Sequence, residues 1–217
     1  IWWSADGENF QLVEGTDPGE FSSGDFTAVD AMVADPNDDN RVWFGCNAGF
    51  GFIEDGVMTM SPSNDINGAV ADLSIAPDGS YMLIGMNNCR VYRSEGSDFT
   101  SFSSVSGSNN DDTVLPQSGN GRVRVAISID DPNNAFAVFA TSGGSFGGLY
   151  HSGNAGETWS NVWPNDILEA TPLPRNQGIY DLALGVKQGT PDLAYVGGIE
   201  LWRSGPNQQA ELAAYAF

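Results

Sequence analysis

Basic side chains are scarce in this sequence of 217 residues, which carries 28 acidic residues against 8 basic ones and a formal net charge of −20. Lys187 is the only lysine. A surface of this sign repels nucleic-acid phosphates and anionic lipid headgroups, so neither is an expected partner. The acidic excess suits an extracellular surface, where it serves solubility, or salty and calcium-containing water that screens self-repulsion.

Cysteine and histidine are also rare. Cys46 and Cys89 are too few for a disulfide-rich scaffold and lack the spacing of a zinc site. His151, the single histidine, has no Ser or Cys partner evident in the sequence, so a structural role is expected for it. No phosphate-binding loop, dinucleotide fingerprint or metal-ligand cluster occurs, and we expect no metal centre and no cofactor.

Long apolar runs are missing as well. No run approaches the roughly 18 residues that span a bilayer, so membrane insertion is not expected. The N-terminal segment IWWSADG has neither an initiating Met nor a charged-then-apolar signal, which favours a mature or internal piece whose export is specified elsewhere.

Short apolar runs, 27 Gly and 11 Pro are present instead, and this composition is typical of an all-β protein. One pattern recurs: an apolar inner strand, a Pro/Asp/Asn turn, an apolar strand ending in small residues, and a strand of the form apolar-aromatic-x-Ser before a polar turn. Its four copies occupy residues 28–56, 69–99, 122–159 and 178–207, with the end of a further copy at residues 1–10.

Each copy reads as four short strands separated by turn residues, which is the size and content of a propeller blade. We therefore predict one β-propeller segment over residues 1–217, with about four and a half antiparallel four-stranded blades that form part of a larger ring. The predicted blades cover residues 1–15 (the end of one blade), 26–61, 69–105, 121–163 and 178–217.

A polar turn in the third copy has a specific spacing. Residues 152–159, SGNAGETW, match the pattern S-x-D-x-G-x-T-W with Asn in place of Asp. A shortened form occurs at residues 4–10, and degenerate forms occur at 94–99 and 204–207. The Asp or Asn should accept backbone N–H bonds, the Gly should take positive φ, and the aromatic ring should pack between blades. The residues in these structural roles are Ser4, Asp6, Gly7, Phe10, Ser152, Asn154, Gly156 and Trp159.

On these residues the chain resembles the Asp-box, or BNR-repeat, propeller superfamily, which includes sialidases, sortilin-type receptors, xyloglucan-cleaving glycosidases and photosystem assembly factors. The segments IYDLALG and PDLAYVGGIELWRS look most similar to sortilin-like or glycosidase-like proteins secreted to bacterial surfaces. The resemblance implies a secreted, extracellular or cell-surface protein whose inter-blade face binds a protein or glycan.

Three inter-blade connections are long, at residues 13–25, 103–120 and 161–177, and loops of this length are often functional. The third carries Trp163 and Arg175, an aromatic and a cation that we predict as partner contacts. The alternative is a loop that only covers the seam between blades.

The inner strands place further polar residues near the expected channel. If the protein is a glycoside hydrolase, Asp30, Asp72 and Asp181 are the candidate acid and base. The alternative is that such Asp residues accept backbone hydrogen bonds from a neighbouring blade. Arg122 and Arg124 are further binding candidates, expected on opposite faces of their strand unless a bulge intervenes. Without a third arginine or an Arg-Ile-Pro-like segment, a sialidase is disfavoured.

The sequence leaves alternatives at two structural sites, a polar turn and a pair of cysteines. Asp35, Asn37 and Asp39 superficially resemble a calcium loop, yet the Gly and Glu of an EF-hand are missing, so a hairpin turn is favoured over a loosely bound Ca²⁺. Cys46 and Cys89 follow equivalent strands of adjacent blades, and either a disulfide between blades or two buried thiols would fit.

The sequence thus favours a non-enzymatic recognition or structural propeller, for which no catalytic residue is assigned. A glycoside hydrolase is the first alternative, and a structural subunit of a surface or secretion assembly is the second.

Overall fold

The computed structural model describes residues 1–4, 6–14, 28–61, 63–107, 113–117, 120–163, 177–204 and 210–214. These residues form four antiparallel four-stranded sheets, which we call blades 1 to 4 in chain order. Blade 1 has β3 (Val29–Ala34), β4 (Arg41–Cys46), β5 (Gly49–Glu54) and β6 (Val57–Met60); blade 2 has β7 (Val70–Ile75), β8 (Met82–Met86), β9 (Val91–Ser94) and β10 (Phe102–Ser104). Blade 3 has β13 (Asn120–Ile127), β14 (Ala135–Thr141), β15 (Phe146–Ser152) and β16 (Ser160–Trp163); blade 4 has β17 (Ala183–Val186), β18 (Ala194–Gly197), β19 (Leu201–Ser204) and β20 (Ala210–Ala214).

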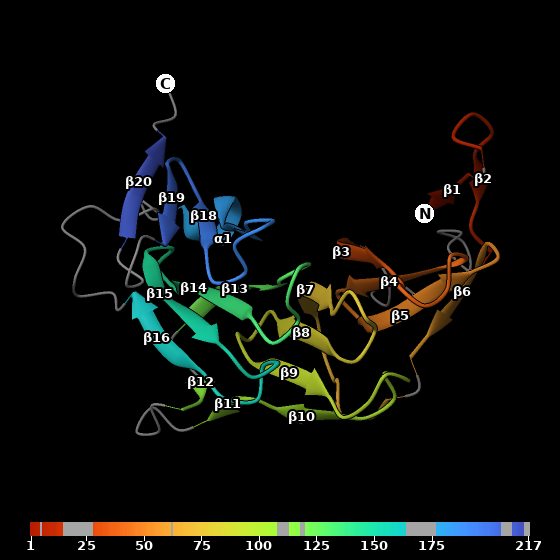
Figure 1. Ribbon diagram of the computed structural model, residues 1–217. Coiled ribbons are helices and arrows are strands. Elements are labelled where there is room, and N and C mark those ends of the chain that lie inside the picture. The colour runs from red at the N-terminus through yellow and green to blue at the C-terminus, as the bar shows by residue number, and fades with distance from the viewer. Residues whose placement is uncertain are drawn as a thin grey trace.

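Each blade is a simple meander, and its first strand is the innermost one. The inner strands β3, β7, β13 and β17 contact one another in that order. Figure 1 shows the blades following one another around an open arc, with blade 1 at one end and blade 4 at the other. The predicted all-β propeller architecture of antiparallel four-stranded blades is confirmed.

A short hairpin precedes blade 1. It pairs β1 (Trp2–Trp3) with β2 (Gln11–Leu12). The chain then runs beside the outer strand of blade 1, where Glu14 N–H donates to Gly56 O at 2.9 Å and Met58 N–H donates to Glu14 O at 3.0 Å. Val13, fully buried, packs this hairpin against blade 1 together with Phe44, Cys46 and Ile53.

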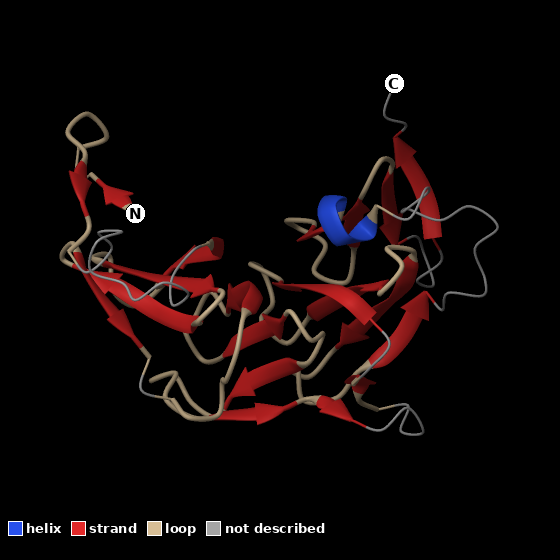
Figure 2. Cartoon of the chain, turned by 180° about the vertical axis from the view of Figure 1, so that it is seen from behind, coloured by secondary structure: helices blue, strands red, loops and turns tan. Residues whose placement is uncertain are grey.

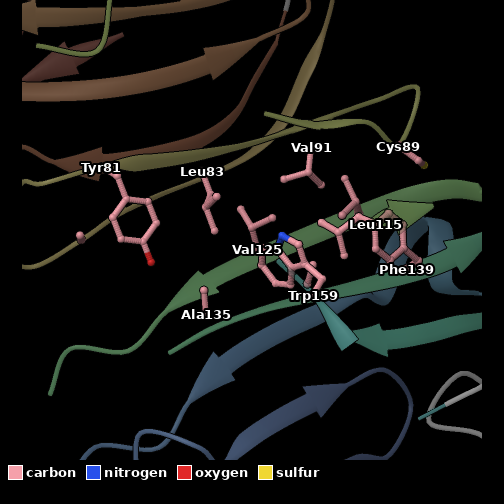
Figure 3. Packing of buried hydrophobic residues seen from close by; sticks show 12 residues of the cluster. Tyr81, Leu83, Cys89, Val91, Leu115, Val125, Ala135, Phe139 and Trp159 are labelled. Atoms are coloured by element: carbon pink, nitrogen blue, oxygen red, sulfur yellow. The ribbon is translucent and has the colours of Figure 1, made fainter. Parts of the chain in front are cut away.

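The blades are held together by apolar clusters at their seams. The seam of blades 1 and 2 includes Trp43, Phe50, Val70, Ile84, Phe99 and Phe102; the seam of blades 2 and 3 includes Tyr81, Leu83, Val123, Val125, Phe139 and Trp159; the seam of blades 3 and 4 includes Phe136, Val138, Leu149, Trp163, Val196 and Trp202. Figure 3 shows how side chains of blade 2 face those of blade 3, with the Trp159 indole between them. Because side chains of a strand alternate in direction, each blade presents one apolar face to each neighbour.

Two glycines allow the close approach of neighbouring blades. A Cβ on Gly45 would lie 2.4 Å from Val70 Cγ1, and one on Gly85 would lie 2.9 Å from Val123 Cγ1. Gly45 and Gly85 occupy the same register in β4 and β8, so a valine of the next inner strand fills the same space each time. Glycine is required here by packing against the next blade.

Some structure was not expected from the sequence. The fourth copy begins with a helical turn, α1 (Gly178–Asp181), and its inner strand starts only at Ala183. Figure 2 shows α1 on the inner side of blade 4. The connection at 103–120 also contains a parallel pair, β11 (Ser106–Gly107) with β12 (Leu115–Pro116). Among the described residues, no helix is long and apolar enough to cross a membrane.

Candidate functional site

The polar residues of the inner strands gather on β7 and β13. Arg122 Nη1 donates to Ile179 O at 2.8 Å, and Arg124 Nε donates to Leu182 O at 3.0 Å. Both guanidinium groups therefore reach main-chain carbonyls at the start of the fourth copy. The expectation of opposite faces was wrong, because residues two apart in a strand project to the same side.

Arg124 joins three blades at once. Its Nη1 donates to Ala71 O of blade 2 at 2.7 Å while its Nε bonds to the start of blade 4. Hydrogen bonds from a charged donor are among the stronger ones in proteins. Arg124 therefore connects the blades, with one donor each from Nε and Nη1 bonded to a main-chain carbonyl.

Asp72 of blade 2 also connects two blades, because it accepts a hydrogen bond from blade 3. Its Oδ2 accepts the Val125 N–H at 2.9 Å, and its Oδ1 lies 3.5 Å from Arg124 Nη1. Burial raises the pKa of Asp72, opposed by the hydrogen bond from Val125 and the charge of Arg124. Ser74 Oγ accepts the Ile127 N–H at 3.1 Å in the same way. The structure thus shows the inter-blade hydrogen bonding that the sequence left as the alternative to catalysis.

The other two candidate carboxylates, Asp30 and Asp181, are both exposed. Burial and the charge of Arg124 lower the pKa of Arg122, while the negative charges of Asp30 and Asp72 oppose this shift. Asp30 and Asp72 therefore both act electrostatically on the Arg122 guanidinium.

The predicted contact residue Trp163 lies in the core, so this prediction is corrected. It is 2% exposed and packs with Phe146 at the seam of blades 3 and 4. The alternation of β16 turns its indole toward blade 4, where it cannot reach a glycan or protein surface. Arg175 and most of the three long connections lie outside the described residues.

Each of the two Asp-box-like hairpins contains its own network of polar hydrogen bonds. Asp6 Oδ1 accepts the N–H groups of Glu8 and Asn9 at 2.9 and 2.8 Å, and the Gly7 N–H donates to Ser4 Oγ at 2.8 Å. The hydrogen bonds, foremost that from the Asn9 backbone, hold the pKa of Asp6 well below its usual value.

In blade 3, Asn154 takes the place of the carboxylate. Its Oδ1 accepts the Thr158 N–H at 3.0 Å, and Ser152 Oγ accepts the Gly156 N–H at 2.9 Å. Trp159 is 3% exposed and donates from Nε1 to Gly156 O at 3.0 Å. Phe10, expected to pack between blades like Trp159, is instead 61% exposed.

The cysteines are two free, buried thiols, and the inter-blade disulfide is not formed. Cys46 faces the N-terminal hairpin, whereas Cys89 lies at the seam of blades 2 and 3. The two thiols point to opposite sides of the blade pair. Burial raises the pKa of both, that of Cys89 to about 12.

Asp35 and His151 have structural contacts. Asp35 Oδ1 accepts the Asn37 N–H at 2.9 Å and Oδ2 accepts the Trp43 indole N–H at 2.8 Å. Asp35 is 7% exposed and directed into the core, which argues against the loose calcium site with Asn37 and Asp39. His151 Nε2 lies 2.8 Å from Asn134 Oδ1, and burial lowers the pKa of its imidazole.

A cleft of about 440 Å³ between the N-terminal hairpin and blade 1 was missed by sequence reasoning. Trp3 and Ser4 line one side, and two turns of blade 1 line the other, through Asp39, Asn40, Asp55 and Gly56, with Val42 and Ile53 at the base. The sequence marked these segments as turns and a strand. Their meeting depends on how the hairpin docks, for which no short-range signal exists.

Comparisons with known proteins place the fold and leave the family open. No protein-family model matches the chain, and no curated protein matches it in sequence. Solved structures match in fold at low identity. The GH74 xyloglucanase from Xanthomonas campestris superposes with a TM-score of 0.59 at 17% identity, over 88% of this chain and 31% of that chain.

Two further solved structures illustrate the range of proteins that are similar to this chain in fold. An ancestral GH74 enzyme matches with a TM-score of 0.63 at 14% identity, over 96% of this chain and 27% of that one. A chain of a nidogen/laminin complex matches with a TM-score of 0.57 at 12% identity, over 86% of this chain and 64% of that one. This chain therefore spans less than two thirds of each, and the likeness establishes a β-propeller fold that enzymes and binding proteins share.

Proposed function

We propose that this chain is part of a secreted recognition propeller of the Asp-box type, sortilin-like in kind, which binds a protein or glycan rather than hydrolysing one. One observation carries the proposal. Arg124 and Asp72, the central polar pair of the inner strands, hold the blades together through main-chain hydrogen bonds. Groups committed in this way are poorly suited to move a proton during a reaction.

The blade arrangement supports a role for further blades or subunits as partners. Gly197 of β18 occupies the register of Gly45 and Gly85, each of which receives a valine from the following blade. Among the described residues, only Ala183 of its own blade lies within 4 Å of a Cβ built at Gly197. This face of blade 4 is therefore shaped for another blade, which would extend the ring. A structural subunit of a surface or secretion assembly, the second alternative, would use the same face.

A glycoside hydrolase stays the second candidate because of Asp72. A carboxyl group whose pKa is raised by burial is a feature of general acids in glycosidases. Two of the structures similar in fold are GH74 enzymes, one of them a xyloglucanase, although the identity of 14–17% carries the fold alone.

The test separates binding from turnover on one sample. The purified chain is incubated with xyloglucan and other soluble glycans, and new reducing ends are measured; binding to the same glycans and to extracellular-matrix proteins is measured by biolayer interferometry. We expect saturable binding without new reducing ends. Turnover that disappears in Asp72→Asn, in a variant whose melting temperature is unchanged, would establish the hydrolase instead.

A further inference from the structure

The cleft beside Trp3 joins an aromatic ring to two carboxylates. Asp39 and Asp55 are exposed at its rim, and within the described part of the chain neither forms a hydrogen bond or an ion pair. Its volume of about 440 Å³ lies within the range of small-molecule and side-chain binding sites. No basic residue lines it.

Trp3 is held in place by a turn of blade 1. Gly56 has a φ of +80°, and a Cβ there would lie 2.5 Å from the Trp3 Nε1. The indole therefore rests directly on the Asp55–Gly56 turn, which only a glycine permits. The Glu14 N–H bond to Gly56 O at 2.9 Å fixes the same turn to the N-terminal segment. The aromatic wall and the Asp55 carboxylate are thus positioned by one contact.

Elsewhere the protein places arginine on an aromatic ring beside oxygen acceptors. The Arg41 guanidinium lies 5.0 Å from the centroid of the Phe52 ring and 3.0 Å from a Glu54 carboxylate oxygen. The two components of this arrangement, a ring and a carboxylate, recur in the cleft.

Arg93 repeats the arrangement in blade 2. It lies 4.8 Å from the Tyr81 ring centroid and donates to Ala155 O at 2.7 Å. Arginine over an aromatic face gains cation–π stabilisation that grows as the cation is desolvated. The lining of the cleft includes both a ring, that of Trp3, and the carboxylate acceptors Asp39 and Asp55.

We propose that this cleft binds an arginine side chain of a basic segment on a partner protein, with the guanidinium against Trp3 and paired to Asp39 and Asp55. The inference rests on the proposed function and names the chemistry of the partner. Charge complementarity supports it, because the chain has a net charge of −20 and would attract a basic segment over a long range.

The experiment uses a fluorescein-labelled Gly-Arg-Gly-Arg-Gly peptide and the same peptide with citrulline, a neutral isostere, at both arginine positions. Binding is measured by fluorescence anisotropy, and the Trp3 indole N–H is followed by NMR with Trp3→Phe for assignment. We expect the arginine peptide to shift the Trp3 resonance. Asp39→Asn/Asp55→Asn should weaken binding by about fivefold, since each exposed ion pair contributes modestly. Trp3→Ala should weaken it by roughly three- to tenfold, and Trp3→Phe by less.

The matched control is Glu157→Gln/Asp192→Asn, which removes the same charge from exposed positions of blades 3 and 4. It should change affinity by less than about twofold. The proposal is overturned if the citrulline peptide binds equally well, if the control loses as much affinity as the cleft variant, or if a neutral xyloglucan oligosaccharide shifts Trp3 instead. None of these outcomes alters the turnover and binding assays of the proposed function, so the two can fail separately.

Discussion

The hairpins at residues 4–10 and 152–159 have similar internal hydrogen bonds and opposite surroundings. In both, a serine hydroxyl accepts the N–H of a glycine, Gly7 for Ser4 and Gly156 for Ser152. Asp6 Oδ1 accepts two backbone N–H groups further along its turn, and Asn154 Oδ1 accepts one. In the first the aromatic residue Phe10 is 61% exposed, while in the second Trp159 is 3% exposed. The turn is thus a local structure, and the burial of its aromatic ring depends on a neighbouring blade.

Gly156 shows what the neighbouring blade adds. A Cβ there would lie 3.1 Å from Leu83 Cδ2 of blade 2 and 3.6 Å from both Tyr81 and Trp159. At Gly7, a Cβ would have nothing within 4 Å. Matched substitutions in the two hairpins should therefore differ in cost, even though the local contacts agree.

The largest difference is expected for the aromatic residues. Trp159→Ala should destabilise the protein by about 3–5 kcal/mol, because it leaves a cavity between blades 2 and 3. Phe10→Ala should cost less than about 0.5 kcal/mol, since the ring is largely in water already. Urea denaturation followed by circular dichroism checks both, and equal losses would contradict the comparison.

The next largest difference in stability is expected for the serines of the two hairpins. Ser152 is 1% exposed, and Ser152→Ala would leave the Gly156 N–H without its acceptor, at a cost of about 1–3 kcal/mol. Ser4→Ala should reduce the free energy of unfolding by only roughly a few tenths of a kcal/mol, because water can replace the hydroxyl at Gly7. Thermal unfolding of the two variants measures the difference, and Ser152→Thr, which keeps the hydroxyl, separates its loss from a change of volume.

The glycines should differ less. Gly7→Ala and Gly156→Ala both place a side chain at positive φ, +76° and +80°, which costs about 1 kcal/mol each. Gly156→Ala should cost more, because Leu83 must also move. If the two melting temperatures fall equally, the contact with blade 2 contributes nothing.

The smallest effect concerns pH. The pKa of Asp6 lies below its usual value, so its contribution to stability is present above the unfolded pKa of about 4 and is lost as the pH falls through the folded value. Asn154 does not titrate. The Glu8 N–H donates to Asp6 Oδ1 and the Thr158 N–H donates to Asn154 Oδ1, so NMR of these two amides during acidification should show opening at Glu8 alone.

Asp6→Asn should abolish that response and Asn154→Asp should create one at Thr158. An acid response at Thr158 in the natural sequence would contradict this assignment.

Several features were predictable because they depend on short-range chemistry. The repeat of apolar strands and turn residues predicted the four-stranded blades. Alternation of side chains in β13 should likewise have placed Arg122 and Arg124 on one face. The single helical turn at Gly178–Asp181 was not predicted, because its carbonyls are satisfied by arginines of another blade.

The candidate sites were less predictable. Trp163 was predicted to lie at a surface, and the cysteines were left open between a disulfide and two buried thiols. The seam that each side chain faces is set by strand direction and blade order. The cleft at Trp3 needed the docking of a hairpin on turns more than 30 residues away in sequence, at Asp39 and Asp55. For Asp72 the sequence left a catalytic acid and an acceptor of inter-blade hydrogen bonds as alternatives, and the Val125 N–H that donates to it identifies the second.

The sequence by itself determined the all-β repeat, the turns and their internal hydrogen bonds, because these arise between residues only a few positions apart. The tertiary structure alone decided which aromatic rings are buried, which arginines join blades and where an acidic, aromatic cleft opens. Those outcomes depend on contacts between blades, and a contact energy between distant segments is not encoded in any one of them.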